Sequence, residues 1–231
     1  PITSNLGTDF MYDTPSSEFM LNMYKKSTSG EMHTKAAIKR ASSICSSCIN
    51  LINNYMMRTA LEKQVPLIAG GYIGGQVPKD TAIINLNLLQ HNAIHSQTVK
   101  NYAKAFGISA NKYFAFDNKI IENYKYDSLH VLNPMLALPV SESEILSIIT
   151  EIGWIKPLDT GQNSSNCLLN DLGIAIHHKK YNFNPYEAEL ADQVRNGLMK
   201  REDAIKKVQS IPDFRNLKTQ ADKIGLNLND F

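Results

Sequence analysis

The chain has three cysteines, and their spacing constrains its fold and chemistry more than any other feature. Cys45 and Cys48 form a Cys-x-x-Cys pair, and Cys167 follows far downstream. Apolar residues recur at helical spacing across residues 33–61, which predicts one or two helices there and places the pair on one helical face. Cys167 can reach the pair only through the fold. Three protein ligands would leave a coordination position open on zinc, which has four ligands in structural sites, or one iron free on an iron-sulfur cluster.

Two other interpretations of the cysteines stay open. A Cys-x-x-Cys pair is also typical of redox proteins with a thioredoxin-like fold, and cysteines are often small buried side chains without a chemical role. The metal interpretation therefore depends on Cys167 folding back onto the pair. A low and odd number of cysteines is typical of a reducing compartment.

Length and charge limit the remaining function classes. The 231 residues allow one large domain or a domain with an appendage. A formal net charge of +2 gives no strong argument for a nucleic-acid or membrane surface, although Lys35, Lys39 and Arg40 can contact phosphates. The apolar runs are too short to span a bilayer and no signal peptide opens the sequence, so we expect a cytoplasmic protein. The first residue is Pro1, which predicts a processed product or a piece of a longer chain.

A hydrophobic run followed by glycines lies at residues 65–76. Its sequence predicts a buried parallel strand that ends in a glycine-rich turn. Ligands of open α/β sheets bind at the carboxyl ends of strands, where glycines let a backbone approach closely. We therefore expect a nucleotide or substrate here, with Gly70, Gly71 and Gln76 beside the nucleotide and the acceptor. The alternative is a tight turn that needs positive φ, and the spacing differs from the Gly-x-Gly-x-x-Gly dinucleotide motif.

Turn, cap and periodicity signals predict the other elements. A short strand is expected within residues 1–14 and another over residues 129–132. Helices are expected from Pro15 to about residue 26, over 81–106, from a Ser141 cap to about residue 152, over 185–196 and over 201–210, with a turn-helix-turn in 211–231. The polar loop 154–167 carries the third cysteine, and its length favours a binding site over a linker.

The order of these features resembles that of the PP-loop ATP pyrophosphatase superfamily, also called adenine nucleotide alpha-hydrolase-like. It is similar to tRNA 2-thiolation enzymes in the Cys-x-x-Cys helix, the glycine-rich strand end at 68–76, the strand and glutamate-bearing helix at 132–149, and the loop with a third cysteine. The resemblance implies a HUP-like, Rossmann-like three-layer α/β domain with a parallel sheet over residues 1–180, incomplete at its N-terminus. It implies a helical C-terminal extension over 181–231, and a 4Fe-4S cluster held by Cys45, Cys48 and Cys167.

A second stretch resembles another branch of this superfamily. Residues 186–197, followed by Arg201-Glu202-Asp203-Ala204, are similar to the C-terminal end of N-acetyl sugar amidotransferases. Both branches use ATP with Mg²⁺ to activate a substrate oxygen as its adenylate, and a nucleophile then displaces AMP. The nucleophile delivers sulfur in the first branch and nitrogen in the second, where the cysteines would hold a structural zinc.

One departure from the superfamily concerns ATP binding. The Ser-Gly-Gly-x-Asp-Ser loop, whose backbone amides hold pyrophosphate, is absent, together with the strand and helix around it. We expect this loop upstream on a longer polypeptide or on a partner subunit, so that the chain acts as a homo-oligomer or in a complex. Residues 72–76 replace the histidine- and aspartate-rich segment of the tRNA enzymes, which weakens the case for tRNA as substrate.

The resemblance thus implies an ATP-dependent sulfur transferase, or thiolation enzyme, that modifies a small-molecule or RNA acceptor with sulfur from a donor. Arg40 is expected to contact an anion, with a solvated helix charge as the alternative, and the loop Asn163, Ser164, Ser165 and Asn166 is expected to bind the substrate. No catalytic acid or base is assigned. One alternative is an amidotransferase with zinc and an ammonia donor. The other is a non-catalytic subunit that binds nucleotide or a partner protein, with cysteines that are merely buried.

Overall fold

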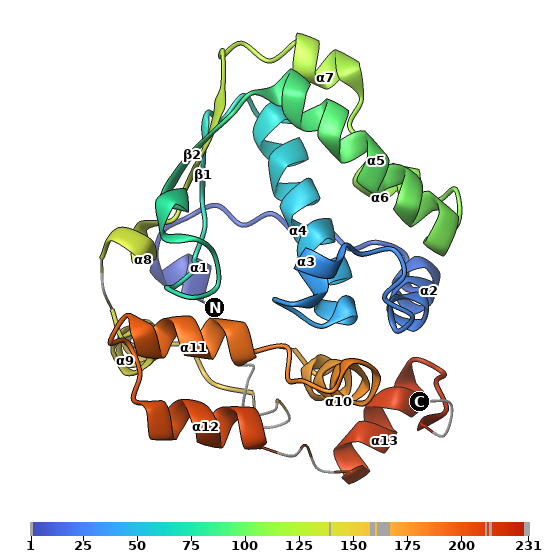
Figure 1. Cartoon of the computed structure of the whole chain (residues 1–231). Helices are drawn as coiled ribbons and strands as arrows, with labels where there is room; N and C mark the ends of the chain where they lie inside the picture. Colours follow the sequence, from blue (N-terminus) through green and yellow to red (C-terminus); the bar gives the residue numbers. More distant parts are fainter. Residues whose placement is uncertain are drawn as a thin grey trace.

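The chain is mostly helical and contains a small sheet (Figure 1). The computed structural model describes residues 2–138, 140–157, 160, 167–210, 212 and 214–228. The strands are β1 (Leu67–Ala69), β2 (Ile83–Leu86) and β3 (Leu129–Leu132), and a short 3-10 helix, η1 (Lys79–Thr81), precedes β2. The helices are α1 (Ile2–Asn5), α2 (Ser17–Ser27), α3 (Lys35–Ile38), α4 (Ser43–Glu62), α5 (Leu88–Phe106), α6 (Ala110–Phe114), α7 (Asn118–Glu122), α8 (Pro134–Ala137), α9 (Glu142–Glu151), α10 (Asn170–Tyr181), α11 (Glu187–Arg195), α12 (Arg201–Gln209) and α13 (Phe214–Lys223). Among these described helices, none combines the length and the apolar composition that crossing a bilayer requires.

The sheet contains three strands in the order β1-β3-β2. β1 runs parallel to β3, with Leu67 opposite His130. β2 runs antiparallel to β3, with Ile83 opposite Leu132. The expected parallel sheet is therefore wrong, because one of the two strand pairs is antiparallel. The Rossmann-like three-layer domain is wrong as well, since the described chain is mostly helical around this small mixed sheet.

The two faces of the sheet have different surroundings. On one face, Ile68, Leu86 and Leu129 pack in one hydrophobic cluster with residues of α4, α5 and α7. On the other face, the side chain of Leu67 is 48% exposed and that of Ile83 is 65% exposed. A three-layer α/β domain has helices on both faces of its sheet, so the open face is a second departure from the expected architecture.

β2 replaces the first part of the helix expected over residues 81–106. The Asn87 side chain accepts a hydrogen bond from the backbone N–H of Gln90 at 3.0 Å, which caps α5 and makes Leu88 its first residue. The four residues of β2 lie before this cap and pair with β3. A helix, α1, also stands within residues 1–14, where a strand was expected.

α4 runs between the sheet and the helices α2 and α5 (Figure 1). Its first half packs against α2, α5 and α6 through Leu51, and its second half packs against one face of the sheet through Leu61. Burial along its length fixes the direction of this helix. It thereby fixes the position of Cys45 and Cys48, which lie near its beginning.

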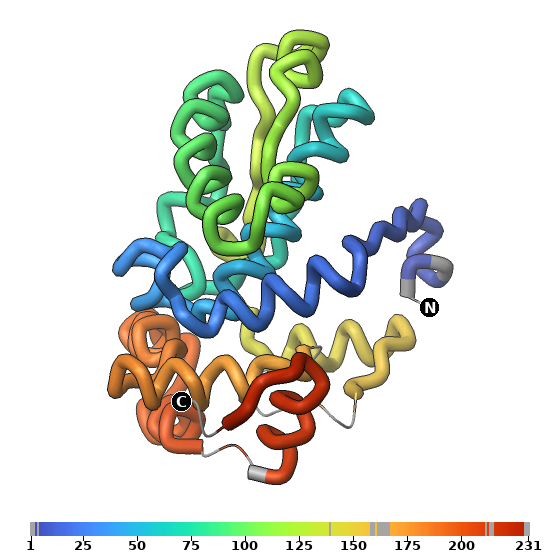
Figure 2. The backbone as a smooth tube through the Cα atoms, turned by 90° about the vertical axis from the view of Figure 1, so that its right-hand side faces the viewer, coloured from blue at the N-terminus to red at the C-terminus, as the bar shows by residue number. Residues whose placement is uncertain are grey.

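The helices α10 to α13 form a layer beneath α2 and the sheet-bearing part of the molecule (Figure 1 and Figure 2). One hydrophobic cluster joins this layer to α4, because Ile44 of α4 packs with Leu172 and Ile176 of α10 and with Ala221 of α13. The elements described after α10 are the helices α11, α12 and α13. A domain division at residue 180 stays a prediction.

Candidate functional site

Cys45 and Cys48 lie in the first two turns of α4. The Ser42 hydroxyl accepts a hydrogen bond from the backbone N–H of Cys45 at 3.2 Å and so fixes where the helix begins. Cys48 follows almost one turn later on the same face, and both side chains are half-buried. The positive end of the helix dipole favours negative charge here, which supports thiolates as ligands.

The approach of α10 to α4 brings the third cysteine to the same place. Cys167 lies just before the first turn of α10. The two helices meet closely at Gly173, where a Cβ atom would stand 2.7 Å from the Ser42 hydroxyl oxygen. Cys167 consequently lies within electrostatic reach of both Cys45 and Cys48. We call Cys45, Cys48 and Cys167 the cysteine cluster.

Burial keeps the thiols of Cys45 and Cys48 protonated near neutral pH. It raises the pKa of Cys45 to about 11, against a decrease from the interaction of the thiol with the Ser42 side chain and with further increases from Cys167 and Cys48. Burial, and then Cys167, also raises the pKa of Cys48. A metal ion removes the proton of a coordinating thiol, so these thiols become anionic ligands only when a cation accompanies them.

Polar side chains from other helices surround the cluster. The hydroxyl of Tyr24 in α2 lies near the sulfur of Cys48, and each side chain affects the pKa of the other. The Oδ1 atom of Asn170 accepts two hydrogen bonds, from the Tyr186 hydroxyl at 2.8 Å and from the Cys45 thiol at 3.6 Å. The cluster is therefore bordered by α2, by the start of α10 and by the residue that precedes α11.

The three thiols are neighbours but are not arranged as metal ligands. In the part of the chain that the structure describes, no three His, Cys, Asp or Glu side chains are placed to hold one ion. The chemistry of the donor set nevertheless fits a metal, because thiolates suit zinc and iron-sulfur clusters. The beginnings of α4 and α10 also favour negative charge. Coordination would require the thiols to turn toward one another.

The glycine-rich loop after β1 packs closely on α11 and the residues that follow it. Gly75 has a φ of +92°, and a Cβ atom there would lie 2.5 Å from the carbonyl oxygen of Glu189. A Cβ atom at Gly74 would lie 2.6 Å from the Leu198 side chain. Packing and positive φ thus account for these two glycines, which agrees with the tight-turn alternative.

The three residues expected to contact nucleotide have different surroundings. A Cβ atom at Gly70 would lie 2.3 Å from Asn133 Oδ1, so this glycine is required by packing at the ends of β1 and β3. The Gln76 side chain accepts a hydrogen bond from the Ile73 backbone N–H at 3.1 Å and so stabilises the loop itself. Gly71 has no atom within 4 Å of a Cβ position. Of the three, Gly71 leaves room for a ligand.

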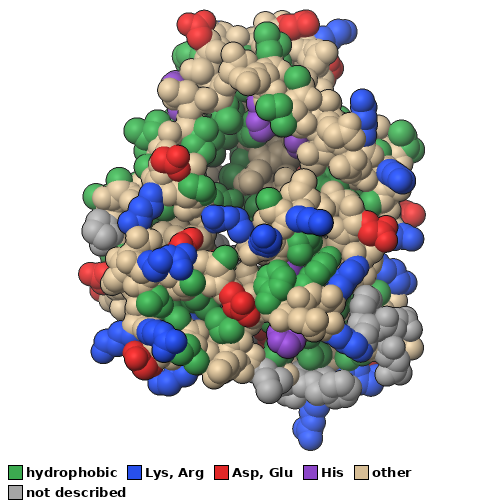
Figure 3. All heavy atoms as spheres, in the orientation of Figure 1, with side chains coloured by type: hydrophobic (Ala, Val, Ile, Leu, Met, Phe, Trp, Pro, Cys, Tyr) green, Lys and Arg blue, Asp and Glu red, His purple; other side chains and the backbone are tan. Residues whose placement is uncertain are grey.

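Arg40 and the polar loop are the other expected contacts. Arg40 is exposed, as are its neighbours Lys35 and Lys39, shortly before the Ser42 cap. The face of the molecule drawn in Figure 3 is hollowed between the sheet-bearing part and the lower helices, and Lys and Arg side chains lie along the lower rim of the hollow. The expected substrate-binding loop lies outside the described residues; it comprises Asn163, Ser164, Ser165 and Asn166.

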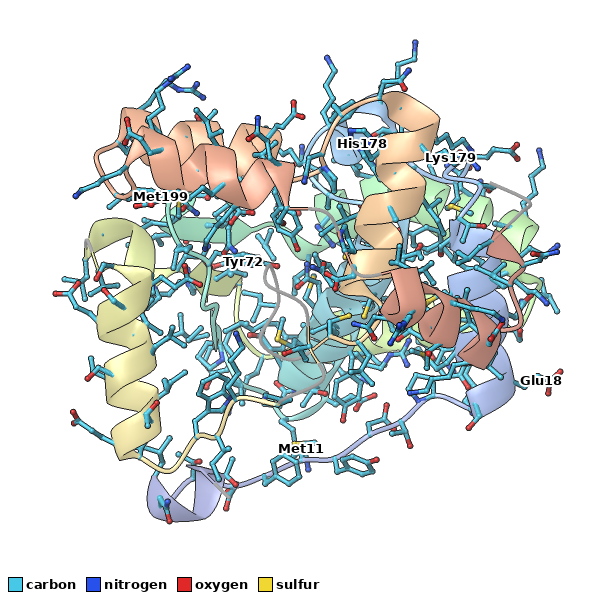
Figure 4. All side chains as sticks on the ribbon, turned by 90° about the horizontal axis from the view of Figure 1, so that it is seen from below. Met11, Glu18, Tyr72, His178, Lys179 and Met199 are labelled. Atoms are coloured by element: carbon cyan, nitrogen blue, oxygen red, sulfur yellow. The ribbon has the colours of Figure 1, made fainter. Side chains whose placement is uncertain are left out.

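A view from below separates the loop from the basic end of α10. Tyr72, which follows the Gly70-Gly71 pair, lies near the centre of Figure 4, whereas His178 and Lys179 lie at the outer end of α10. That end is opposite to the beginning of α10, where the cysteine cluster lies. The basic residues of α10 therefore do not belong to the candidate site.

Sequence reasoning missed two of the residues that border the cluster. Tyr24 and Asn170 were not singled out, and Tyr186 entered only through a resemblance. Asn170 had no usable signal, because the helix that it begins is buried on most sides and has no apolar stripe. Tyr24 had none, since its contact with α4 depends on how α2 packs.

No protein-family model, no curated protein and no solved structure matches the chain. Its function is therefore argued from the cysteine cluster and the residues around it.

Proposed function

We propose that this chain is the metal-binding part of an ATP-dependent sulfur transferase, a thiolation enzyme. The observation that carries the proposal is the meeting of Cys45, Cys48 and Cys167 where α4 and α10 begin. The convergence of three thiols from distant parts of the sequence supports a ligand set over three unrelated buried side chains.

Three thiols suit a centre that keeps one position open for chemistry. A 4Fe-4S cluster normally has four cysteine ligands, so a cluster held by three leaves one iron without a protein ligand. When bound, such a cluster supplies an iron site that can hold a sulfur atom for transfer. The residues of the chain orient the ligands: Ser42 fixes the position of Cys45, and Gly173 allows α10 to approach with Cys167.

The proposed reaction has an activation half and a sulfur-transfer half. ATP with Mg²⁺ converts an oxygen of the acceptor into its adenylate: the oxygen forms a bond to the α-phosphorus, and pyrophosphate leaves. A sulfur nucleophile from the donor then forms a bond to the same carbon, the carbon–oxygen bond breaks, and AMP leaves. Gly71 borders open space beside β1, and Arg40 with its exposed lysine neighbours supplies positive charge for phosphates of ATP or of an RNA acceptor. The acceptor is a small molecule or an RNA.

The pyrophosphate-binding loop would come from an upstream segment or from a partner subunit. Two features of the sheet leave room for such a segment. The face that carries Leu67 and Ile83 is largely exposed, and β1 is an edge strand with unpaired backbone groups on its outer side. A complex or a homo-oligomer therefore belongs to this proposal.

A second candidate function is a zinc-containing sugar amidotransferase, and the position of Tyr186 favours it. The segment that resembles these enzymes begins at Tyr186, whose hydroxyl contacts Asn170 beside the cluster. In this candidate zinc would clamp α4 to α10, and ammonia would replace sulfur as the nucleophile. A non-catalytic subunit that binds nucleotide or a partner protein is the remaining alternative.

Metal content separates these functions. Iron, acid-labile sulfide and zinc per chain should be measured on anaerobically purified protein, for the wild type, for Cys167→Ala and for Ser46→Ala. Ser46 is a buried residue of the same turn of α4 without a ligating sulfur, so this variant controls for local damage.

We expect about four irons with matching sulfide in the wild type and in Ser46→Ala, and their loss in Cys167→Ala. One zinc per chain in place of iron would support the amidotransferase. Metal-free wild type, or a Cys167→Ala variant with its full metal content, would contradict the three-cysteine centre and leave the non-catalytic subunit.

A further inference from the structure

A serine, a histidine and an asparagine are joined by hydrogen bonds on the open face of the sheet. His130 of β3 stands between Leu67 of β1 and Asn85 of β2, so the three side chains share one face. Ser128 precedes His130 by two residues and points to the same side. The Ser128 hydroxyl oxygen lies 3.2 Å from His130 Nε2, and Asn85 Oδ1 lies 2.5 Å from His130 Nδ1.

The amide oxygen of Asn85 fixes which nitrogen of His130 carries the proton. An amide oxygen can only accept a hydrogen bond, so Nδ1 is the donor. Nε2 of the neutral ring then has the lone pair, and the Ser128 hydroxyl donates to it. A nucleophile, a general base and a group that orients the base activate a serine in this order. An asparagine takes the third place in papain-like proteases.

A second contact between a serine and a histidine lacks this order. His33 Nε2 lies 2.9 Å from the Ser47 hydroxyl oxygen and 3.1 Å from the Ser43 carbonyl oxygen. The carbonyl can only accept, so this nitrogen carries the proton and cannot take one from Ser47. The side chain of Ser47 is also 0% exposed. Ser128 is half-buried, so a substrate can reach its hydroxyl group.

We propose that Ser128 and His130 are the catalytic residues of an acyl-transfer site for activated carboxylic esters, with Asn85 as a positioning residue. The Ser128 oxygen forms a bond to the acyl carbon, the ester bond to the leaving oxygen breaks, and His130 passes the serine proton to the leaving group. Water then forms a bond to the acyl carbon. The bond to Ser128 breaks, and His130 passes a water proton to the serine oxygen as the carboxylic acid leaves.

The neutral amide of Asn85 limits the substrate to activated esters. A carboxylate in its place would stabilise the imidazolium by its charge, whereas an amide does so only by its dipole. His130 is thereby a weaker base, which suits an electrophilic carbonyl with a good leaving group, as in an aryl ester. Leu67 beside His130 is 48% exposed and Ile83 of β2 is 65% exposed, which gives a short apolar acyl chain a surface to lie on.

The inference does not depend on the proposed function. The cysteine cluster lies where α4 and α10 begin, whereas Ser128, His130 and Asn85 belong to the sheet and the residue before β3. An upstream segment paired with the outer edge of β1 would extend the sheet and leave this row of side chains accessible.

Hydrolysis of p-nitrophenyl butyrate by the full chain tests the inference, together with covalent labelling by a fluorophosphonate. The label forms when the serine oxygen bonds to phosphorus and fluoride leaves, and mass spectrometry of the digested protein locates it. We expect the label on Ser128, and its loss in Ser128→Ala and His130→Gln. The rate of ester hydrolysis in these two variants should fall by about 10²- to 10⁴-fold, the usual share of general-base catalysis.

Ser47→Ala is the matched control, because it removes the other hydroxyl group that contacts a histidine. We expect it to keep the wild-type rate and label. Asn85→Leu should lower the rate by about 100-fold or more, since nothing then fixes the proton on Nδ1. Asn85→Asp should keep the rate, because its carboxylate accepts from the same nitrogen. Equal losses in both Asn85 variants would overturn the positioning role.

Three results would overturn the catalytic site. The first is a wild type without ester hydrolysis or without label on Ser128. The second is a wild-type rate in Ser128→Ala. The third is equal loss of activity in Ser128→Ala and Ser47→Ala. A rate that falls in His130→Gln but not in Ser128→Ala would assign the hydrolysis to direct attack by the imidazole. If His130→Gln does not fold, the label and rate of Ser128→Ala decide the question, with folding checked by circular dichroism.

Discussion

Replacement of Gly75 by alanine tests how closely the glycine-rich loop packs on α11. The φ of Gly75 is +92°, and an added Cβ atom would lie 2.5 Å from the backbone carbonyl oxygen of Glu189 and 3.2 Å from Gln193 Cγ. The first neighbour belongs to the backbone of a helix, so it cannot move aside as the end of a side chain can. Loop and helix must therefore separate to accommodate the methyl group.

The expected loss of stability follows from two terms. A non-glycine residue with left-handed backbone geometry costs about 1–2 kcal/mol, and forced overpacking costs about 1–3 kcal/mol. Gly75→Ala should therefore lower the free energy of unfolding by roughly 2–5 kcal/mol. In a chain of this size each kcal/mol corresponds to roughly 2–4 °C in Tm. Thermal and denaturant unfolding, followed by circular dichroism, measure the change.

Gly71→Ala is the matched control in the same loop. A Cβ atom there has no neighbour within 4 Å, and Gly71 is not among the glycines with positive φ. Its replacement should be neutral or stabilise the fold by about 0.4–1 kcal/mol through the unfolded state. Equal losses for the two variants would refute the packing argument. A Gly71→Ala variant with full stability but weakened ATP binding would support nucleotide contact at this residue.

Two further predictions concern α10: one tests its close contact with α4 at Gly173, and the other tests the protonation of its buried His177. Gly173→Ala should push the Ser42 hydroxyl away from the Cys45 N–H and lower the free energy of unfolding by up to about 2 kcal/mol through the lost helix cap. In a Ser42→Ala background the same change should be neutral or stabilising by up to about 1 kcal/mol. Additive effects of the two substitutions in denaturant unfolding would contradict this contact. His177 is 1% exposed, and burial, followed by the charge of His178, lowers its pKa from 6.5 to about 4. Between pH 6.5 and about 4 the unfolded chain therefore binds a proton that the folded chain does not. The free energy of unfolding should fall by up to about 1.4 kcal/mol per pH unit as the pH decreases through this window. His177→Leu should remove this pH dependence of the free energy of unfolding. A variant whose stability has the same pH profile as the wild type would refute the role of His177.

Local sequence signals predicted the elements whose limits are set locally. β3 covers residues 129–132, as expected. The side chains of Ser141 and Glu144 form the capping box that starts α9. β2 was missed because Ile83, Leu86 and the following apolar residues also have helical spacing. The cap at Asn87 marks the true beginning of α5, and strand pairing depends on β3, which lies far away in the sequence.

α10 shows why the candidate site could be predicted only in part. Its buried residues include Leu172, Ile174, Ile176 and His177, which point in several directions around the helix. Periodicity detects a helix with one apolar and one polar face, and a helix that is buried on most sides has no such stripe. No element was predicted over residues 170–181. The approach that brings Cys167 to α4 was therefore invisible, although the three cysteines themselves were identified from their type and spacing.

The contacts of α11 connect the two halves of the proposed reaction. In its first turn, the carbonyl of Glu189 lies against Gly75, in the same loop as Gly71, which is expected to lie beside the nucleotide. At its beginning, Tyr186 contacts Asn170, which in turn contacts Cys45. One short helix thus borders both the loop and the cysteine cluster. An acceptor activated beside the loop would lie close to sulfur held at the cluster, and a shift of α11 would alter both places together. The segment that resembles amidotransferases is therefore the part of the chain where nucleotide and metal chemistry would meet.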